Sequence, residues 1–83
     1  MQFEVNASEN VRAIVEAEIV LRERDLREIE KKLSSIAYNY ARELNSSIKL
    51  SLQMENVELI NCRQEIKKEL ADLNNKLLVL ERS

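Results

Sequence analysis

Apolar residues recur along the first half of the chain at alternating steps of three and four, the spacing of one face of an α-helix. The members of this series are Val15, Ile19, Leu26, Ile29, Leu33, Ile36 and Tyr40. Only Arg22 interrupts it. In such heptads two apolar positions in every seven form a continuous stripe, here called the seam. The pattern predicts a long helix whose seam packs against another helix.

The second half of the chain repeats this pattern in a different phase. Its series consists of Ile48, Leu52, Leu59, Cys62, Ile66, Leu70, Leu73, Leu77 and Leu80. Beside it, Leu50, Met54 and Val57 form a second apolar line, which continues the register of the first half. Extending that register further would place polar residues such as Asn61 in the core. A turn between the halves explains the change of phase more simply.

The segment from Glu43 to Ser47 is the best candidate for this turn, because asparagine tolerates the left-handed conformation that ends helices and serine caps new ones. At the other end, Asn6 has the spacing of a helix N-cap, with Glu9 three residues later. We predict a single helical domain with these parts: a tail at 1–5, a helix at about 7–44, a turn at about 45–47 and a helix at about 48–82. Two alternatives stay open, one unbroken helix of about 125 Å and a three-helix arrangement.

Composition supports an all-α fold, since the chain contains no glycine, no proline and no tryptophan. Its charged and apolar fractions, 34% and 45%, are typical of amphipathic helices, and the net charge is −2. We therefore expect neither the basic excess of a nucleic-acid-binding protein nor a basic face for anionic lipid. No apolar run approaches the ~18 residues that span a bilayer, so membrane insertion is not expected.

The expectations about cellular compartment and enzymatic activity rest on residues and segments that the chain lacks. No secretion signal is evident at the N-terminus and the lone Cys62 has no internal partner, which favours a cytoplasmic, intracellular protein. Without histidine or glycine there is no nucleophile triad, no helical di-iron motif and no phosphate-binding loop. One cysteine does not make a zinc site. We therefore expect no enzymatic activity, no metal or other cofactor, and no small-molecule substrate.

Some polar residues fall on or near the seams. Arg22 reads as a side chain that extends to the bundle edge or pairs with a glutamate, with a register-setting core role as the alternative. Asn56 and Arg63 hold similar positions when the register of the last leucines is extended backwards. Cys62 is expected to be a small buried apolar residue.

The seams together predict association with other helices. Each buried leucine or isoleucine contributes roughly 1.5–3 kcal/mol, and a lone hairpin would leave much apolar surface wet. We expect a homo-oligomeric helical bundle or a complex with helical partner subunits. The predicted partner-interface residues are Ile19, Leu26, Ile29, Leu33, Ile36, Tyr40, Leu59, Cys62, Ile66, Leu70, Leu73, Leu77 and Leu80.

The Lys67-Lys68-Glu69-Leu70 stretch, followed by leucines at heptad spacing, resembles small coiled-coil subunits of lysosome-positioning and organelle-biogenesis complexes. The general format also resembles the small helical-hairpin chaperones of bacterial type III secretion. The apolar seams predict a non-catalytic coiled-coil interaction module, a small structural subunit or adaptor of a multi-chain assembly. The alternative is a binding chaperone that shields a helix of a client protein.

Overall fold

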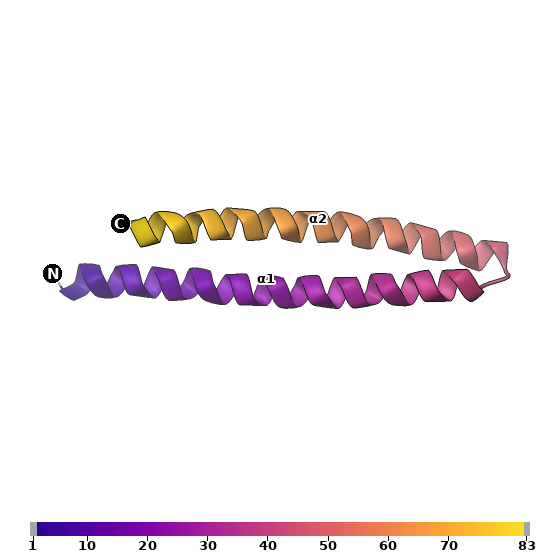
Figure 1. Cartoon of the computed structure of the whole chain (residues 1–83), viewed down its shortest axis with the longest axis horizontal. Coiled ribbons are helices and arrows are strands. Elements are labelled where there is room, and N and C mark those ends of the chain that lie inside the picture. Colours follow the sequence, from indigo (N-terminus) through magenta and orange to yellow (C-terminus); the bar gives the residue numbers. More distant parts are fainter. Residues whose placement is uncertain (1, 83) are drawn as a thin grey trace.

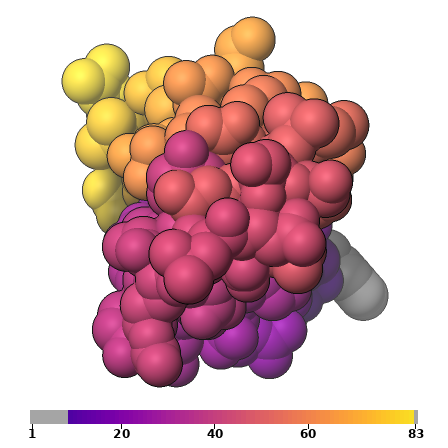
Figure 2. Space-filling view, turned by 90° about the vertical axis from the view of Figure 1, so that its right-hand side faces the viewer, coloured from indigo at the N-terminus to yellow at the C-terminus, as the bar shows by residue number. Residues whose placement is uncertain are grey.

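Two long helices pack antiparallel as a hairpin (Figure 1). The computed structural model describes residues 2–82, with side chains from Glu9 to Arg82. Helix α1 spans Gln2–Arg42 and helix α2 spans Ser46–Arg82. The Cα trace measures 67 × 14 × 14 Å, and Figure 2 shows its narrow cross-section from the turn end. The predicted hairpin is confirmed, and the alternatives of one unbroken helix and of three helices are excluded.

The start of α1 differs from the prediction. The helix begins at Gln2 and not near residue 7, so Asn6 lies inside it and is not its N-cap. No glycine or proline precedes Asn6, and nothing in the local sequence therefore stops the helix from extending through 2–5. The side chains of residues 1–8 are outside the described part of the chain. In Figure 1 this first segment of α1 extends beyond the end of α2.

Residues 43–45 form the turn, slightly earlier than predicted. The backbone N–H groups of Leu44 and Asn45 donate to Oε1 of Glu43, at 3.1 and 3.0 Å. The side chain of Asn45 then caps α2, because its Oδ1 accepts from the N–H groups of Ser47 at 2.9 Å and Ile48 at 3.3 Å. The predicted serine cap is therefore wrong. None of the described residues has a positive φ, so Asn45 does not use the left-handed conformation.

The core is a single line of side chains between the two helices. Among the described residues, Val15, Ile36 and Leu73 are the buried apolar ones, with 7%, 8% and 7% of their surface exposed. Their neighbours along the seams are half-buried, namely Ile19, Leu33, Tyr40, Leu70 and Leu77. A two-helix hairpin has only one contact face per helix, which explains why burial is complete at so few positions.

Three polar contacts define how the helices are aligned. Arg12 donates to Glu81 at 3.3 Å, Arg22 Nε lies 3.1 Å from Oε2 of Glu69, and Gln53 donates to the Tyr40 hydroxyl at 2.9 Å. The numbers of two facing residues therefore sum to about 92 along the whole hairpin. Arg22 is partly exposed and paired with a glutamate, as the simpler of its two interpretations predicted.

Cys62 is exposed, which contradicts its predicted burial. The seam of α2 runs from Leu59 through Arg63 to Ile66, all half-buried, and Cys62 lies one position to the side. The aliphatic stem of an arginine can cover apolar surface while its charged end reaches water, so Arg63 takes the place that the cysteine was expected to fill.

Candidate protein-binding surface

The residues predicted as a partner interface lie mostly within the chain's own core. All of them except Cys62 are buried or half-buried in the hairpin. The two seams therefore satisfy each other inside one molecule, as a helix pair requires. Contact of these residues with a second protein stays a prediction, and the accessible surface beside the seams becomes the candidate for binding.

Many large apolar side chains lie on this accessible surface. Those of the described residues that are strongly exposed are Val11, Ile14, Val20, Leu21, Tyr38, Leu44, Ile48, Leu50, Met54, Val57, Leu78 and Val79. Single exposed apolar residues are normal, but contiguous groups mark interaction sites. Their distribution over the two long sides of the hairpin therefore decides where a partner fits.

One long side of the hairpin, here called the apolar side, carries aliphatic residues from both helices. A groove of about 280 Å³ near the turn identifies it, with Ala37 and Gln53 at its borders. Seven residues are nearly two helical turns, and four residues are about one. The positions of the apolar side are therefore reached in steps of seven residues from Ala37 and Gln53, or from the residues four positions after them. The aliphatic residues of the apolar side are Ala13, Val20, Ala37 and Ala41 of α1, and Leu50, Val57, Ile60, Ala71 and Leu78 of α2.

Along the apolar side the aliphatic residues gather towards the two ends. Leu50 and Val57, 58% and 55% exposed, lie near the turn, whereas Val20 and Leu78, 61% and 49% exposed, lie near the open end. Charged residues lie between and beside these aliphatic residues, and by the same spacing they are Glu16, Glu23, Arg27 and Glu30 of α1 and Lys67 and Glu81 of α2. The apolar side is thus two aliphatic regions with charged residues between and around them, and α2 contributes the larger share of its aliphatic surface.

The opposite long side, here called the acidic side, has another composition. Two grooves in its middle are lined by the charged residues Asp25, Glu28, Lys32, Glu55, Glu58, Glu65 and Glu69. Cys62 lies between them and lines both. Carboxylates outnumber the one lysine, so this side repels a second acidic surface. A third groove at the open end, about 390 Å³, is lined by Val11, Val15, Val79 and Leu80 beside Asp72, Asn75 and Lys76. The acidic side therefore also carries exposed aliphatic residues, mostly near the open end, which by the same spacing are Val11, Ile14, Leu21, Ile48 and Val79.

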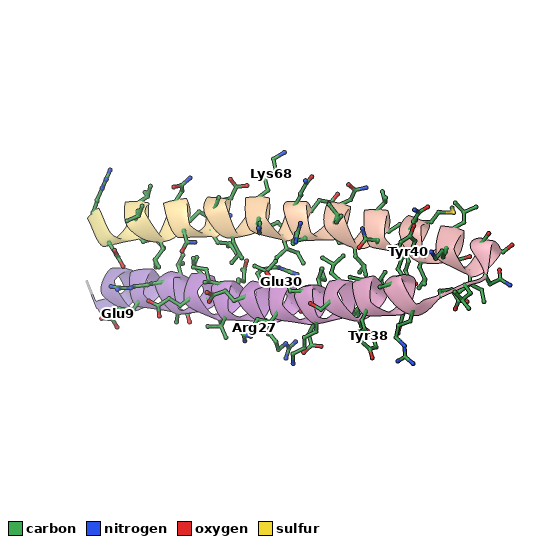
Figure 3. All side chains as sticks on the ribbon, turned by 45° about the vertical axis from the view of Figure 1, so that its right-hand side comes forward. Glu9, Arg27, Glu30, Tyr38, Tyr40 and Lys68 are labelled. Carbon is green, nitrogen blue, oxygen red and sulfur yellow. The ribbon has the colours of Figure 1, made fainter. Side chains whose placement is uncertain are left out.

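The two tyrosines lie on opposite faces of α1, one towards α2 and one away from it (Figure 3). Tyr40 lies between the helices, with Lys49 Nζ 5.0 Å from its ring centroid. Tyr38 points away from α2 and is 61% exposed, and Arg42 covers its ring at 5.3 Å and donates to its hydroxyl at 3.0 Å. The Tyr38 surface is therefore shielded by a cation, which makes it a weaker contact candidate than the aliphatic residues.

The seams do not contain the residues that distinguish the two sides. The second apolar line of the sequence, Leu50, Met54 and Val57, includes two residues of the apolar side, but the seam pattern does not connect this line to Val20 and Leu78. The signal was present, because Leu50 and Val57 are one heptad apart and Leu78 is three heptads beyond Val57. Apolar residues at a constant offset from a seam predict a second contact face.

Comparison with protein-family models, curated proteins and solved structures finds no significant match for this chain. Neither helix, over its described residues, combines the length and apolar character that a membrane crossing requires. Across the described residues no three His, Cys, Asp or Glu side chains come together as a group suited to hold a metal ion. The function must therefore be argued from the surface itself.

Proposed function

We propose that this chain is a non-catalytic protein–protein interaction module, a small structural subunit or adaptor that acts by packing apolar helix faces against helices of another chain. The observation that carries this proposal is the ratio of buried to exposed apolar side chains. Three apolar residues are buried among those described, while large aliphatic residues such as Val20 and Val57 keep more than half of their surface in water.

The energetics of a two-helix fold favour this interpretation. Most helix stability in proteins comes from packing an amphipathic face, and small folds with little core are marginal. Helix α1 between Val11 and Leu21 carries aliphatic residues all around its axis, which is typical of a helix that is covered on several sides. One neighbouring helix covers only one of those sides, so added helices from another chain would complete the core as in a bundle.

Affinity purification of the full chain followed by quantitative mass spectrometry tests the proposal. We expect the wild-type chain to retain helical protein, either further copies of itself or other subunits. Val57→Glu should no longer retain these proteins, because the new carboxylate would have to be desolvated at the contact. A matched change on the other side, Glu58→Gln, should retain the same proteins. Wild-type chain that is folded by circular dichroism, monomeric, and retains nothing would contradict an interaction role.

A further inference from the structure

We propose that the apolar side is a docking surface for a second copy of this chain, with a two-fold axis along the hairpin so that α1 of each copy lies on α2 of the other. This inference rests on the proposed function and names its partner. The apolar side of each copy would be covered, and the acidic sides would face outward. The result is a four-helix bundle in which every neighbouring pair of helices is antiparallel.

The sizes of the aliphatic residues on the apolar side are complementary between helices. Because a rotation about the long axis keeps every residue at its own level, the alignment within one hairpin also applies between copies. Ala41 and Ala37 of one copy then face Leu50 and Val57 of the other, since each pair of numbers sums to about 92. At the open end Ala13 faces Leu78 in the same way. Small residues opposite large ones allow helices to interdigitate.

The charged residues of the apolar side are complementary in part. In this arrangement Lys67 of one copy lies between the levels of Glu23 and Arg27 of the other, so Glu23 is its one acidic neighbour there and Arg27 is a like charge, and each pair occurs twice by symmetry. The other two-fold arrangement would pack α2 on α2. The charged residues of the apolar side of α2 are Lys67 and Glu81, which lie far apart, so Lys67 would have no acidic residue nearby on the facing helix.

The available area is sufficient for a dimer. A side about 55 Å long, the length of the 37 residues of α2 at 1.5 Å per residue, and 14 Å wide covers roughly 800 Å², which matches the ~800 Å² per partner of a standard interface. The acidic side has the same length, but its two middle grooves are lined by six carboxylates and one lysine, so two acidic sides would repel each other. The area is therefore sufficient on either side, and the charge favours the apolar side for the second copy.

Adjacent exposed residues on α1 provide a matched pair of variants. Val20 lies on the apolar side and is 61% exposed, and Leu21 lies on the acidic side and is 48% exposed. We expect the full wild-type chain to be a dimer in sedimentation equilibrium over about a hundredfold range of concentration. Val20→Glu should raise the dissociation constant at least about tenfold, whereas Leu21→Glu should leave it unchanged. Circular dichroism confirms that both variants remain helical.

A charge-exchange experiment tests the orientation and does not depend on Val20→Glu folding. Lys67→Glu and Glu23→Lys should each weaken self-association, while an equimolar mixture of the two should form the heterodimer in preference to either homodimer. Internal pairs within each hairpin are the same before and after mixing, so only contacts between copies change. A mixture that shows no such preference overturns the proposed arrangement.

Other outcomes separate this inference from the proposed function. If the wild-type chain is monomeric at every concentration but retains another helical protein, the proposal of a second copy as the partner is wrong. The proposed interaction role would still hold. A folded monomer that retains nothing overturns both. Equal weakening by Val20→Glu and Leu21→Glu overturns the assignment to the apolar side.

Discussion

The two long sides of the hairpin border the same core but offer different surfaces to other molecules. On the apolar side, the groove near the turn is lined by Ala37, Gln53 and other uncharged residues. On the acidic side, the two grooves in the middle are lined by six carboxylates and one lysine beside apolar and uncharged polar residues. Packing of the two seams therefore explains the fold, whereas the residues next to the seams decide which side a further helix can approach.

The most severe change removes the core that both sides share. Leu73 is 7% exposed, and Leu73→Asp would bury a carboxylate between the helices, so we expect a loss of at least about 3 kcal/mol and a largely unfolded chain. Circular dichroism during thermal unfolding measures the effect. Leu78→Asp is the control in the same helix, where a 49% exposed side chain should leave the helicity of the hairpin intact. Equal loss of helicity in Leu73→Asp and Leu78→Asp would contradict this expectation, because it would mean that exposed Leu78 stabilises the hairpin as much as buried Leu73.

A change at the polar position of the α1 seam should be much milder. Arg22 Nη1 contacts Asp25 and Nε contacts Glu69, both at 3.1 Å, but the Arg22 side chain is 44% exposed. Because water and salt screen such pairs, we expect Arg22→Ala to cost about 0.5–1 kcal/mol in urea unfolding at low salt.

The matched control for this change is Arg24→Ala, which removes an exposed arginine two residues away. Its effect should be smaller than that of Arg22→Ala at low salt, and high salt should bring the two variants together. A difference that persists in high salt would indicate that Arg22 acts through packing of its stem and not through its ion pairs.

The smallest expected change is a gain in stability. Glu65 lies on the acidic side with Glu28, Asp25 and Glu69 lining the same groove, and Glu69 is one helical turn away. Glu65→Lys should relieve this repulsion and stabilise the hairpin by about 0.2–0.5 kcal/mol, with Glu65→Gln giving a smaller gain. A loss of stability in either variant during urea unfolding would show that the carboxylates of this side do not repel one another.

The seam of α1 was the most predictable part of the fold. Every apolar residue of its heptad series from Val15 to Tyr40 is buried or half-buried, because the steps of three and four are continuous apart from Arg22. In α2 the half-buried polar residues Asn56 and Arg63 occupy seam positions, so the pattern of apolar residues alone places Cys62 on the seam although it is exposed. Polar seam residues such as Arg63 are recognised only when the heptad register of the last leucines is extended backwards towards the turn.

The ends of the helices were less predictable than their faces. Asn45 and Ser46 are both good caps, and the choice between them depends on Glu43, whose side chain accepts from the two N–H groups that follow it. At the other end, no residue before Asn6 stops α1, so a good cap sequence did not mark its start. The candidate surface could not be assigned from the seams, because it consists of residues beside them.

The start of α1 and the end of α2 lie at the same end of the hairpin, opposite the turn at Leu44 (Figure 1). This placement determines how the molecule responds to mechanical load. Force applied between the two termini would open the helix pair from one end and break the core contacts one after another, as in a zipper. Force applied between a terminus and the turn would instead pull along the helix axes. The hairpin is therefore mechanically weak when pulled by its two ends and stiffer when it serves as a strut along its length.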